Sequence, residues 1–172
     1  MHINGFINAA EEHGFKSRNV IVSGQSAGGH LGSLLVFDRD FQAKNHIDQN
    51  MFSGLALISV PLDFEGWENR RLRRFFDNLV TDAGWEEGNP IRHVVGDEDI
   101  PIICFHGDRD KVVPFHDSES FVERINARQP GLAQLVRSSG LRHSDVMLMF
   151  VRSRYETDAL QRWLESVDKS GS

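Results

Sequence analysis

A serine flanked by glycines, set between an apolar run and a helical pattern, most constrains how this chain can fold. Residues 24–28 read Gly-Gln-Ser-Ala-Gly; they follow the apolar run 19–23 and precede a helical pattern over about 27–37. A nucleophilic serine on a sharp turn from strand to helix has this G-x-S-x-G form. We expect a side chain at either flanking glycine to clash with nearby backbone. The pattern predicts that the Ser26 hydroxyl is presented to solvent, beside the free N–H groups of the helix.

Strand and helix patterns alternate along the rest of the chain. Apolar runs typical of strands recur at 55–60, 102–105 and 133–136, and helical spacing recurs at about 3–13, 117–127 and 156–167. On the helix after the serine we expect Leu31, Leu34 and Leu35 to face the core. This alternation predicts an α/β fold with a mainly parallel sheet and flanking helices.

Residues 61–99 interrupt this alternation. The aromatic residues Phe64, Trp67 and Trp85 lie there among prolines and glycines, with a helical stretch around 71–80. They would either line an acyl or alcohol pocket or close the core over the sheet edge. We predict one domain over 1–172 with an excursion or cap-like segment at about 61–99, since 172 residues suffice for a single core.

Charge and cysteine content narrow the classes of partner. The formal net charge is -6, which argues against nucleic acid as a partner, because binding a polyanion needs a basic face. The single cysteine, Cys104, cannot form an internal disulfide, and its apolar strand predicts a buried small side chain rather than a nucleophile. The chain as given shows neither a signal peptide nor a membrane span, which favours a cytoplasmic location.

A basic stretch could contact an acidic surface. Arg70, Arg71, Arg73 and Arg74 alternate with apolar neighbours, a composition that can attract an anionic membrane. Because the chain is acidic overall, we favour a solvated helix face over membrane contact.

Two loops carry the partners that a serine nucleophile needs. A serine hydroxyl requires a general base, and the base requires an acid that fixes its tautomer. Residues 106–114 follow the third predicted strand, and residues 140–145, which include His143, follow the fourth. Both loops belong at the C-terminal edge of a parallel sheet, where catalytic groups collect. We therefore expect the acid in the first loop and His143 as the base.

The segments GQSAGGHL, FHGDRDKVVP and LRHSD together resemble the nucleophile turn, acid loop and histidine loop of α/β-hydrolase esterases. The G-Q-S-A-G form, the helix start at 117–121 and the His-Ser-Asp ending resemble the carboxylesterase branch that contains isoprenylcysteine methylesterase-like and kynurenine-formamidase-like enzymes. The resemblance implies Asp110 as the acid, with Asp108 as the alternative, and the N–H of Ala27 as an oxyanion donor.

The resemblance covers only the C-terminal part of the family fold. Such enzymes carry four earlier strands and an H-G-G-type loop that supplies a second oxyanion donor; loss of one donor typically costs about 2.7–4 kcal/mol. The partial resemblance also implies that the apolar strand at 20–22, which is central in the family, forms an open edge here. We therefore expect self-association through that edge.

These observations predict a serine carboxylic-ester hydrolase that works through an acyl-enzyme. Its substrate would be a small-molecule ester, and lipophilic esters are among the candidates. Ser26, His143 and Asp110 would carry the reaction, which needs no cofactor or metal. An amide or formamide hydrolase of the same fold and a catalytically silent binding module are the alternatives. His106-x-Asp108-x-Asp110 could also be drawn as a metal site, but it matches the acid loop better.

Overall fold

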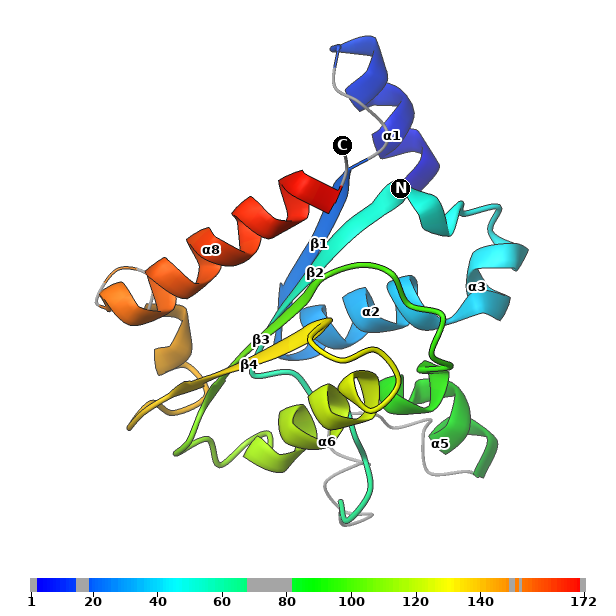
Figure 1. Ribbon diagram of the computed structural model, residues 1–172. Coiled ribbons are helices and arrows are strands. Elements are labelled where there is room, and N and C mark those ends of the chain that lie inside the picture. Colours follow the sequence, from blue (N-terminus) through cyan, green and yellow to red (C-terminus); the bar gives the residue numbers. More distant parts are fainter. Residues whose placement is uncertain (1–2, 15–18, 68–81, 149–150, 152, 171–172) are drawn as a thin grey trace.

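The computed structural model describes residues 3–14, 19–67, 82–148, 151 and 153–170. Its centre is a sheet of four parallel strands in the order β1-β2-β3-β4 (Figure 1). The strands are β1 (Val20–Gln25), β2 (Phe52–Ile58), β3 (Ile102–Gly107) and β4 (Ala133–Ser138). The predicted α/β class with a parallel sheet is confirmed, and β1 and β4 are the two outer strands.

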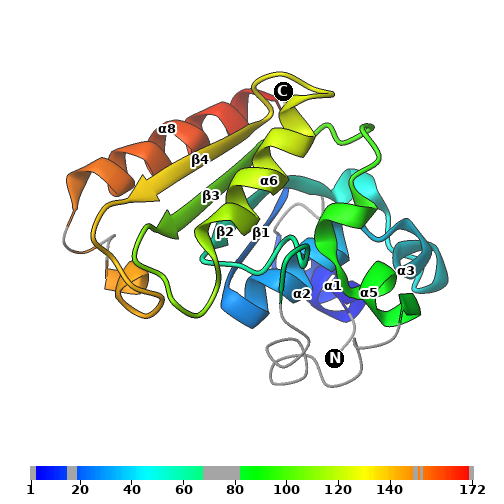
Figure 2. The ribbon, with the colours of Figure 1, turned by 90° about the horizontal axis from the view of Figure 1, so that it is seen from below.

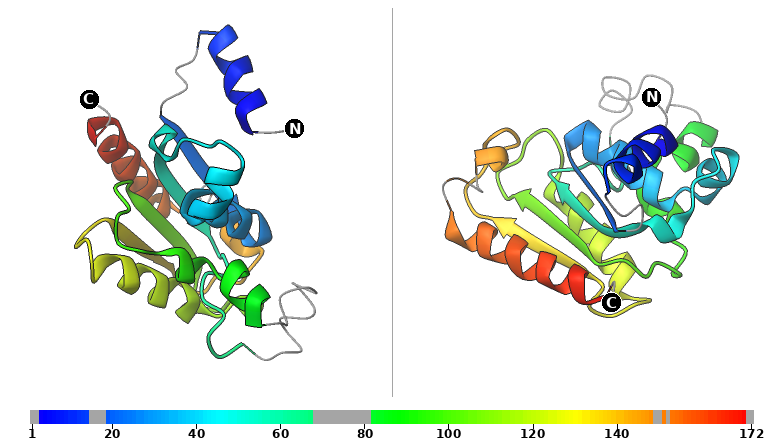
Figure 3. Two further views of the ribbon diagram at one scale, coloured as in Figure 1. Left: turned by 90° about the vertical axis from the view of Figure 1, so that its right-hand side faces the viewer. Right: turned by 90° about the horizontal axis from the view of Figure 1, so that it is seen from above.

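Helices cover both faces of this sheet. On one face lie α2 (Ser26–Phe37) and α6 (Phe115–Asn126), and on the other lies α8 (Arg154–Ser170), as Figure 2 shows. The shorter helices are α3 (Arg39–Lys44), α5 (Asp82–Gly88) and the 3-10 turns η1 (Gln49–Met51), η2 (Pro90–His93) and η3 (Asp145–Leu148). Helix α1 (Ile3–Glu12) projects away from the sheet beyond the start of β1 (Figure 3).

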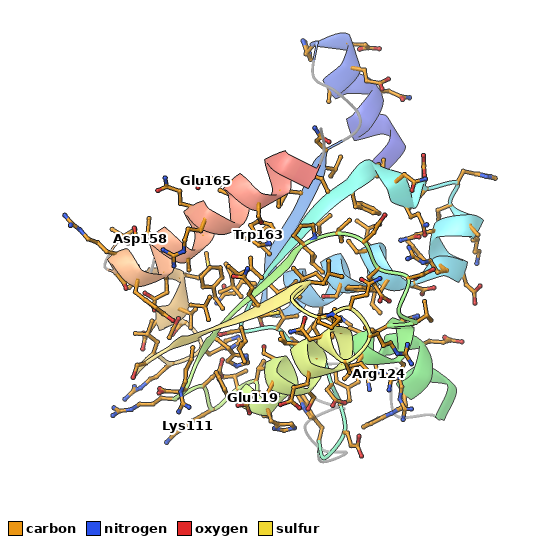
Figure 4. The ribbon with its side chains drawn as sticks, in the orientation of Figure 1. Lys111, Glu119, Arg124, Asp158, Trp163 and Glu165 are labelled. Atoms are coloured by element: carbon orange, nitrogen blue, oxygen red, sulfur yellow. The ribbon has the colours of Figure 1, made fainter. Side chains whose placement is uncertain are left out.

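Side chains of the central strands pack into two hydrophobic cores, one on each face of the sheet. In β2, Leu55 and Leu57 pack among the residues of α2 and α6, whereas Ala56 and Ile58 pack under α8. Trp163 points from α8 into the second core, while Asp158 and Glu165 lie on the outer side of that helix (Figure 4). A strand buried on both faces has no polar alternation, which explains the unbroken apolar runs in the sequence.

Two details differ from the sequence-based expectations. Strand β2 spans Phe52–Ile58, whereas the apolar run in the sequence spans 55–60. The strand ends before the proline because Ser59 adopts a left-handed φ of 48°. On α2, Leu31 is 67% exposed rather than buried. The helical period turns Gly29, Ser33, Val36 and Phe37 onto the sheet, so Leu31 falls on the opposite side of the helix.

Several described residues of the 61–99 segment, Phe64 and Trp67 among them, pack into the core. Phe64 is fully buried, and its ring lies 5.6 Å from that of Trp67 and 5.9 Å from that of Trp85. Val112 and Val113, from the loop after β3, complete this cluster. For these aromatics the packing favours closure of the core. The helix expected at 71–80 and the arginines at 70–74 lie outside the described residues.

No helix within the described part of the chain is both long enough and apolar enough to cross a membrane.

Candidate active site

Ser26 stands on a strained turn between β1 and α2. It is the first residue of the helix, and its φ of 50° lies in the left-handed region that non-glycine residues seldom adopt. Such a conformation typically costs about 1–3 kcal/mol and persists only where surrounding packing enforces it. The strain therefore points to a site at which the position of this hydroxyl matters.

The packing that enforces the turn is a close passage of backbone against backbone. A Cβ on Gly24 would lie 2.5 Å from the backbone N of Gly29, and a Cβ on Gly29 would lie 2.7 Å from the carbonyl O of Gly24 and overlap Val60. A Cβ on Gly28 would meet nothing within 4 Å. The expected clash is confirmed at Gly24 and is wrong at Gly28. Gly29, outside the motif, is the second glycine that the turn requires.

The acid loop holds the Asp110 carboxylate in a fixed position. The Asp110 side chain is fully buried, and its Oδ1 accepts hydrogen bonds from the backbone N–H groups of Val112 and Val113, at 2.8 and 2.9 Å. The N–H of Asp110 itself donates to the carbonyl of Gly107, the last residue of β3. The carboxylate is thus set by the backbone of its own turn.

His143 joins this carboxylate to Ser26. Its Nδ1 lies 2.7 Å from Asp110 Oδ2, and its Nε2 lies 2.9 Å from Ser26 Oγ. Since a carboxylate only accepts, Nδ1–H donates to Asp110, which leaves Nε2 able to accept the serine proton. The structure therefore brings together Ser26, His143 and Asp110 from the C-terminal ends of β1, β4 and β3.

The surroundings of Asp110 favour its ionised form. Burial alone would raise its pKa, but hydrogen bonding from His106, His143 and the backbone of Val113 and Val112 outweighs that effect and holds the pKa of Asp110 well below its usual range. The Asp110 side chain is therefore a carboxylate at neutral pH.

His106 is a buried neighbour of this acid whose contacts the sequence did not predict. Its Nε2 lies 3.2 Å from the carbonyl O of Val113 and 3.5 Å from Asp110 Oδ2, and its Nδ1 lies 2.8 Å from Ser118 Oγ. Because the Val113 carbonyl only accepts, Nε2 carries the proton and Nδ1 accepts from the Ser118 hydroxyl. Its position at the end of a strand buried on both faces is the signal that could have indicated an inward-facing histidine.

Asp108, the alternative acid, faces a different partner. Its Oδ1 accepts from the N–H of Gly140 at 2.7 Å, and its Oδ2 lies 3.3 Å from Nε of Arg137. The Gly140 hydrogen bond is the main cause that lowers the pKa of Asp108, with Arg137 adding to it. Asp108 thereby anchors the loop that carries His143, and the geometry favours Asp110 as the partner of the imidazole.

Gln25 makes a contact with His143 that the sequence did not indicate. Its Nε2 donates to the His143 carbonyl O at 3.1 Å. Ala27, the expected oxyanion donor, is the exposed second residue of α2. The N–H groups of the first helical turn lack partners within the helix, so this N–H is available to a ligand.

His30 and Cys104 are buried side chains that pack within the fold and do not contact Ser26, His143 or Asp110 in the hydrogen bonds described above. His30 is 5% exposed, donates from Nε2 to the carbonyl of Gly88 at 2.7 Å and stacks on Phe64. Burial lowers the pKa of His30, and the bond to Gly88 acts in the opposite direction. Burial also raises the pKa of the Cys104 thiol to about 12, which makes it a poor nucleophile.

Among the residues that the structure describes, no three His, Cys, Asp or Glu side chains are grouped so as to hold a metal ion. His106, Asp108 and Asp110, drawn above as a possible metal set, are each engaged by the partners already named.

Comparison with known proteins places this chain in a family. The model of the BD-FAE family matches residues 2–125, well over half of the chain. The chain belongs to the BD-FAE family. Esterase LipC of Mycobacterium tuberculosis is 26% identical to this BD-FAE chain over an alignment 168 residues long, which covers 89% of the chain and 41% of LipC.

Solved structures support the α/β-hydrolase esterase fold. Propionate-bound Est2, a thermophilic esterase from the Planctomycetes species Thermogutta terrifontis, matches with a TM-score of 0.65 and 27% identity over 95% of this chain. Its form phosphoramylated by tabun matches with a TM-score of 0.63 and 26% identity. The BD-FAE chain spans 58% and 59% of these two chains, and thus less than two thirds of each relative.

The glycines of the turn provide a matched pair of substitutions. Gly24→Ala should destabilise this BD-FAE chain by about 3 kcal/mol or more, because its Cβ would meet backbone that cannot move aside. Gly28→Ala should leave the free energy of unfolding unchanged or slightly raised, since the space is open and alanine favours helix. Urea denaturation of both variants checks this, and equal losses in the two would contradict it.

The two aspartates can be separated in the same way. Asp110→Asn should lower kcat for ester hydrolysis by about 10⁴-fold, because an amide stabilises neither the required tautomer nor the imidazolium. Asp108→Asn should lower it by less than about 10-fold, since the amide oxygen can still accept from Gly140. Steady-state kinetics with a p-nitrophenyl ester measures both. A larger loss in the Asp108 variant would reverse the assignment.

Proposed function

We propose that this chain is a serine carboxylic-ester hydrolase that works through an acyl-enzyme. The observation that carries the proposal is the continuous set of contacts from Ser26 Oγ through the His143 imidazole to Asp110 Oδ2, at 2.9 and 2.7 Å. Kinship to esterases, one of them phosphoramylated by tabun, supports the same class of reaction.

In the first half of the reaction Ser26 Oγ attacks the ester carbonyl carbon. His143 Nε2 takes the hydroxyl proton, and Asp110 stabilises the imidazolium that forms. The carbonyl oxygen becomes an oxyanion beside the N–H of Ala27. His143 then returns the proton to the alkoxy oxygen, the C–O bond breaks and the alcohol leaves. Water repeats the cycle on the acyl-enzyme and releases the carboxylic acid.

The substrate that we propose is a small-molecule ester with a short acyl group. Structures of the Thermogutta esterase with propionate and with butyrate bound support this choice.

The proposal rests on a nucleophile that can be labelled. A fluorophosphonate probe should add one phosphonyl group to Ser26, and the chain should hydrolyse p-nitrophenyl butyrate, because His143 can remove the serine proton. In Ser26→Ala, labelling should disappear and kcat should fall by more than about 1,000-fold. Intact mass spectrometry and absorbance at the p-nitrophenolate band are the measurements.

His143→Ala serves as the companion variant, since it keeps the hydroxyl and removes its base. It should be labelled far more slowly than the unaltered chain. If the unaltered chain is neither labelled nor faster than Ser26→Ala, the esterase proposal is wrong and the catalytically silent binding module replaces it.

We further propose that the chain self-associates through the outer edge of β1. Within the described residues no strand pairs with that edge, and Ile21 on β1 is 38% exposed. An apolar strand with unpaired N–H and C=O groups is a template for pairing with another chain.

Sedimentation velocity should therefore show concentration-dependent dimers or larger species. Ile21→Lys should shift the distribution toward monomer, because a charge on an edge strand opposes pairing. Phe41→Lys is the matched control, since Phe41 is 45% exposed and belongs to α3, which lies well away from β1 (Figure 1). A stable monomer at all concentrations would contradict the proposal.

A further inference from the structure

The loop that carries His143 must reach across the ends of several strands. It leaves β4 at one edge of the sheet, while Ser26 follows β1 at the other edge. Three strand spacings separate these edges, roughly 14 Å. The distance between His143 Nε2 and Ser26 Oγ therefore depends on how a long-reaching loop is held.

Residues from the β3 and β4 side hold the first half of this loop. The N–H of Gly140 donates to Asp108, and the carbonyl of Leu141 accepts from the N–H of Arg109 at 3.0 Å. Leu141 O also passes directly over Gly107, where a side chain would overlap it. After His143, the N–H of Asp145 donates to the Arg142 carbonyl at 3.0 Å. The contacts of Gly140 and Leu141 fix the loop to its own side of the sheet, and the bond from Asp145 closes a turn within the loop.

Gln25 holds the loop from the nucleophile side. Its Nε2 donates to the backbone carbonyl of His143 at 3.1 Å, across 118 residues of sequence. Gln25 is half-buried at the end of β1 and directly precedes Ser26. One bond thus joins the backbone that carries the base to the residue next to the nucleophile, without touching either reacting atom.

We infer that Gln25 is a positioning residue, which sets the distance between His143 and Ser26 for proton transfer. The inference rests on the proposed function. The chemistry of position 25 follows from it: a carbonyl oxygen needs a donor, which an amide supplies and a carboxylate does not. Position 25 would then require a donor long enough to reach the loop, and not merely a polar side chain.

The effect should fall on kcat and not on substrate affinity. Misplacement of a catalytic group by about 1 Å can cost roughly 100-fold in rate. Gln25→Met, which keeps the length of the side chain and removes the donor, should lower kcat by roughly 10- to 100-fold with KM changed by less than about twofold. Gln25→Glu, nearly identical in shape, should lose at least as much, because it sets a charged acceptor against the carbonyl.

The control is Gln134→Met, the same exchange at an exposed position on β4. Its kcat for p-nitrophenyl butyrate and its rate of fluorophosphonate labelling should match those of the unaltered chain. Circular dichroism and thermal unfolding of all three variants verify that they fold, and the Glu variant preserves packing if the Met variant does not.

A double-mutant cycle tests whether Gln25 acts through His143. In a His143→Ala background, Gln25→Met should leave the residual labelling rate unchanged, since no imidazole remains to be positioned. The inference is overturned if Gln25→Met and Gln25→Glu match Gln134→Met, or if Gln25→Met slows labelling equally in both backgrounds. Absence of labelling in the unaltered chain would instead refute the proposed function.

Discussion

The close passage of Gly24 against Gly29 is the contact on which the rest of the site depends. It lets the first turn of α2 lie directly on the end of β1, and that placement puts Ser26 into its left-handed conformation. The strain at Ser26 is offset by the burial of Val36 and Phe37 farther along the same helix. Packing of the C-terminal part of α2 thereby maintains the unfavourable backbone conformation of Ser26 at the N-terminus of the helix.

The acid is stabilised in a different way, by saturating a buried carboxylate with donors. An isolated carboxylate in a protein interior is strongly unfavourable. Here Asp110 Oδ1 accepts from two backbone N–H groups, and Oδ2 lies beside His143 and His106. Because His106 takes its own tautomer from Ser118 and Val113, contacts run from α6 to the nucleophile on α2. The ionised acid and the tautomer of the base therefore stabilise each other.

The sequence predicted those parts of the site that follow from strand ends. Apolar runs located β1, β3 and β4, and parallel strands bring their C-terminal ends to one edge, so Ser26, Asp110 and His143 could be expected to meet there. The sequence did not predict contacts between a side chain and a distant loop. The bond from Gln25 to His143 spans 118 residues with no periodicity to indicate it.

Helix α2 shows the same limit for packing. Leu31 looks like a core residue by hydropathy, yet the sheet is contacted by small residues of the helix, Gly29 and Ser33 among them. A short distance between the helix and sheet backbones requires small side chains on the inner face of the helix. Hydropathy carries no information about that distance. The flanking glycine of the motif was misjudged for a related reason, since Gly28 lies on the open side of the turn that Gly29 closes.

Nucleophile activation and oxyanion stabilisation are physically separate contributions in this chain. The groups proposed to move the proton come from three strand ends within one sheet, whereas the oxyanion donor proposed among the described residues, the N–H of Ala27, belongs to the first turn of α2. Removing an oxyanion donor typically costs about 100- to 1,000-fold in rate, while disabling a Ser-His-Asp triad costs about 10⁴-fold or more. On the proposed mechanism, proton transfer is therefore the larger of the two contributions, and the inferred role of Gln25 makes that contribution depend on how firmly the loop of His143 is held over the end of β1.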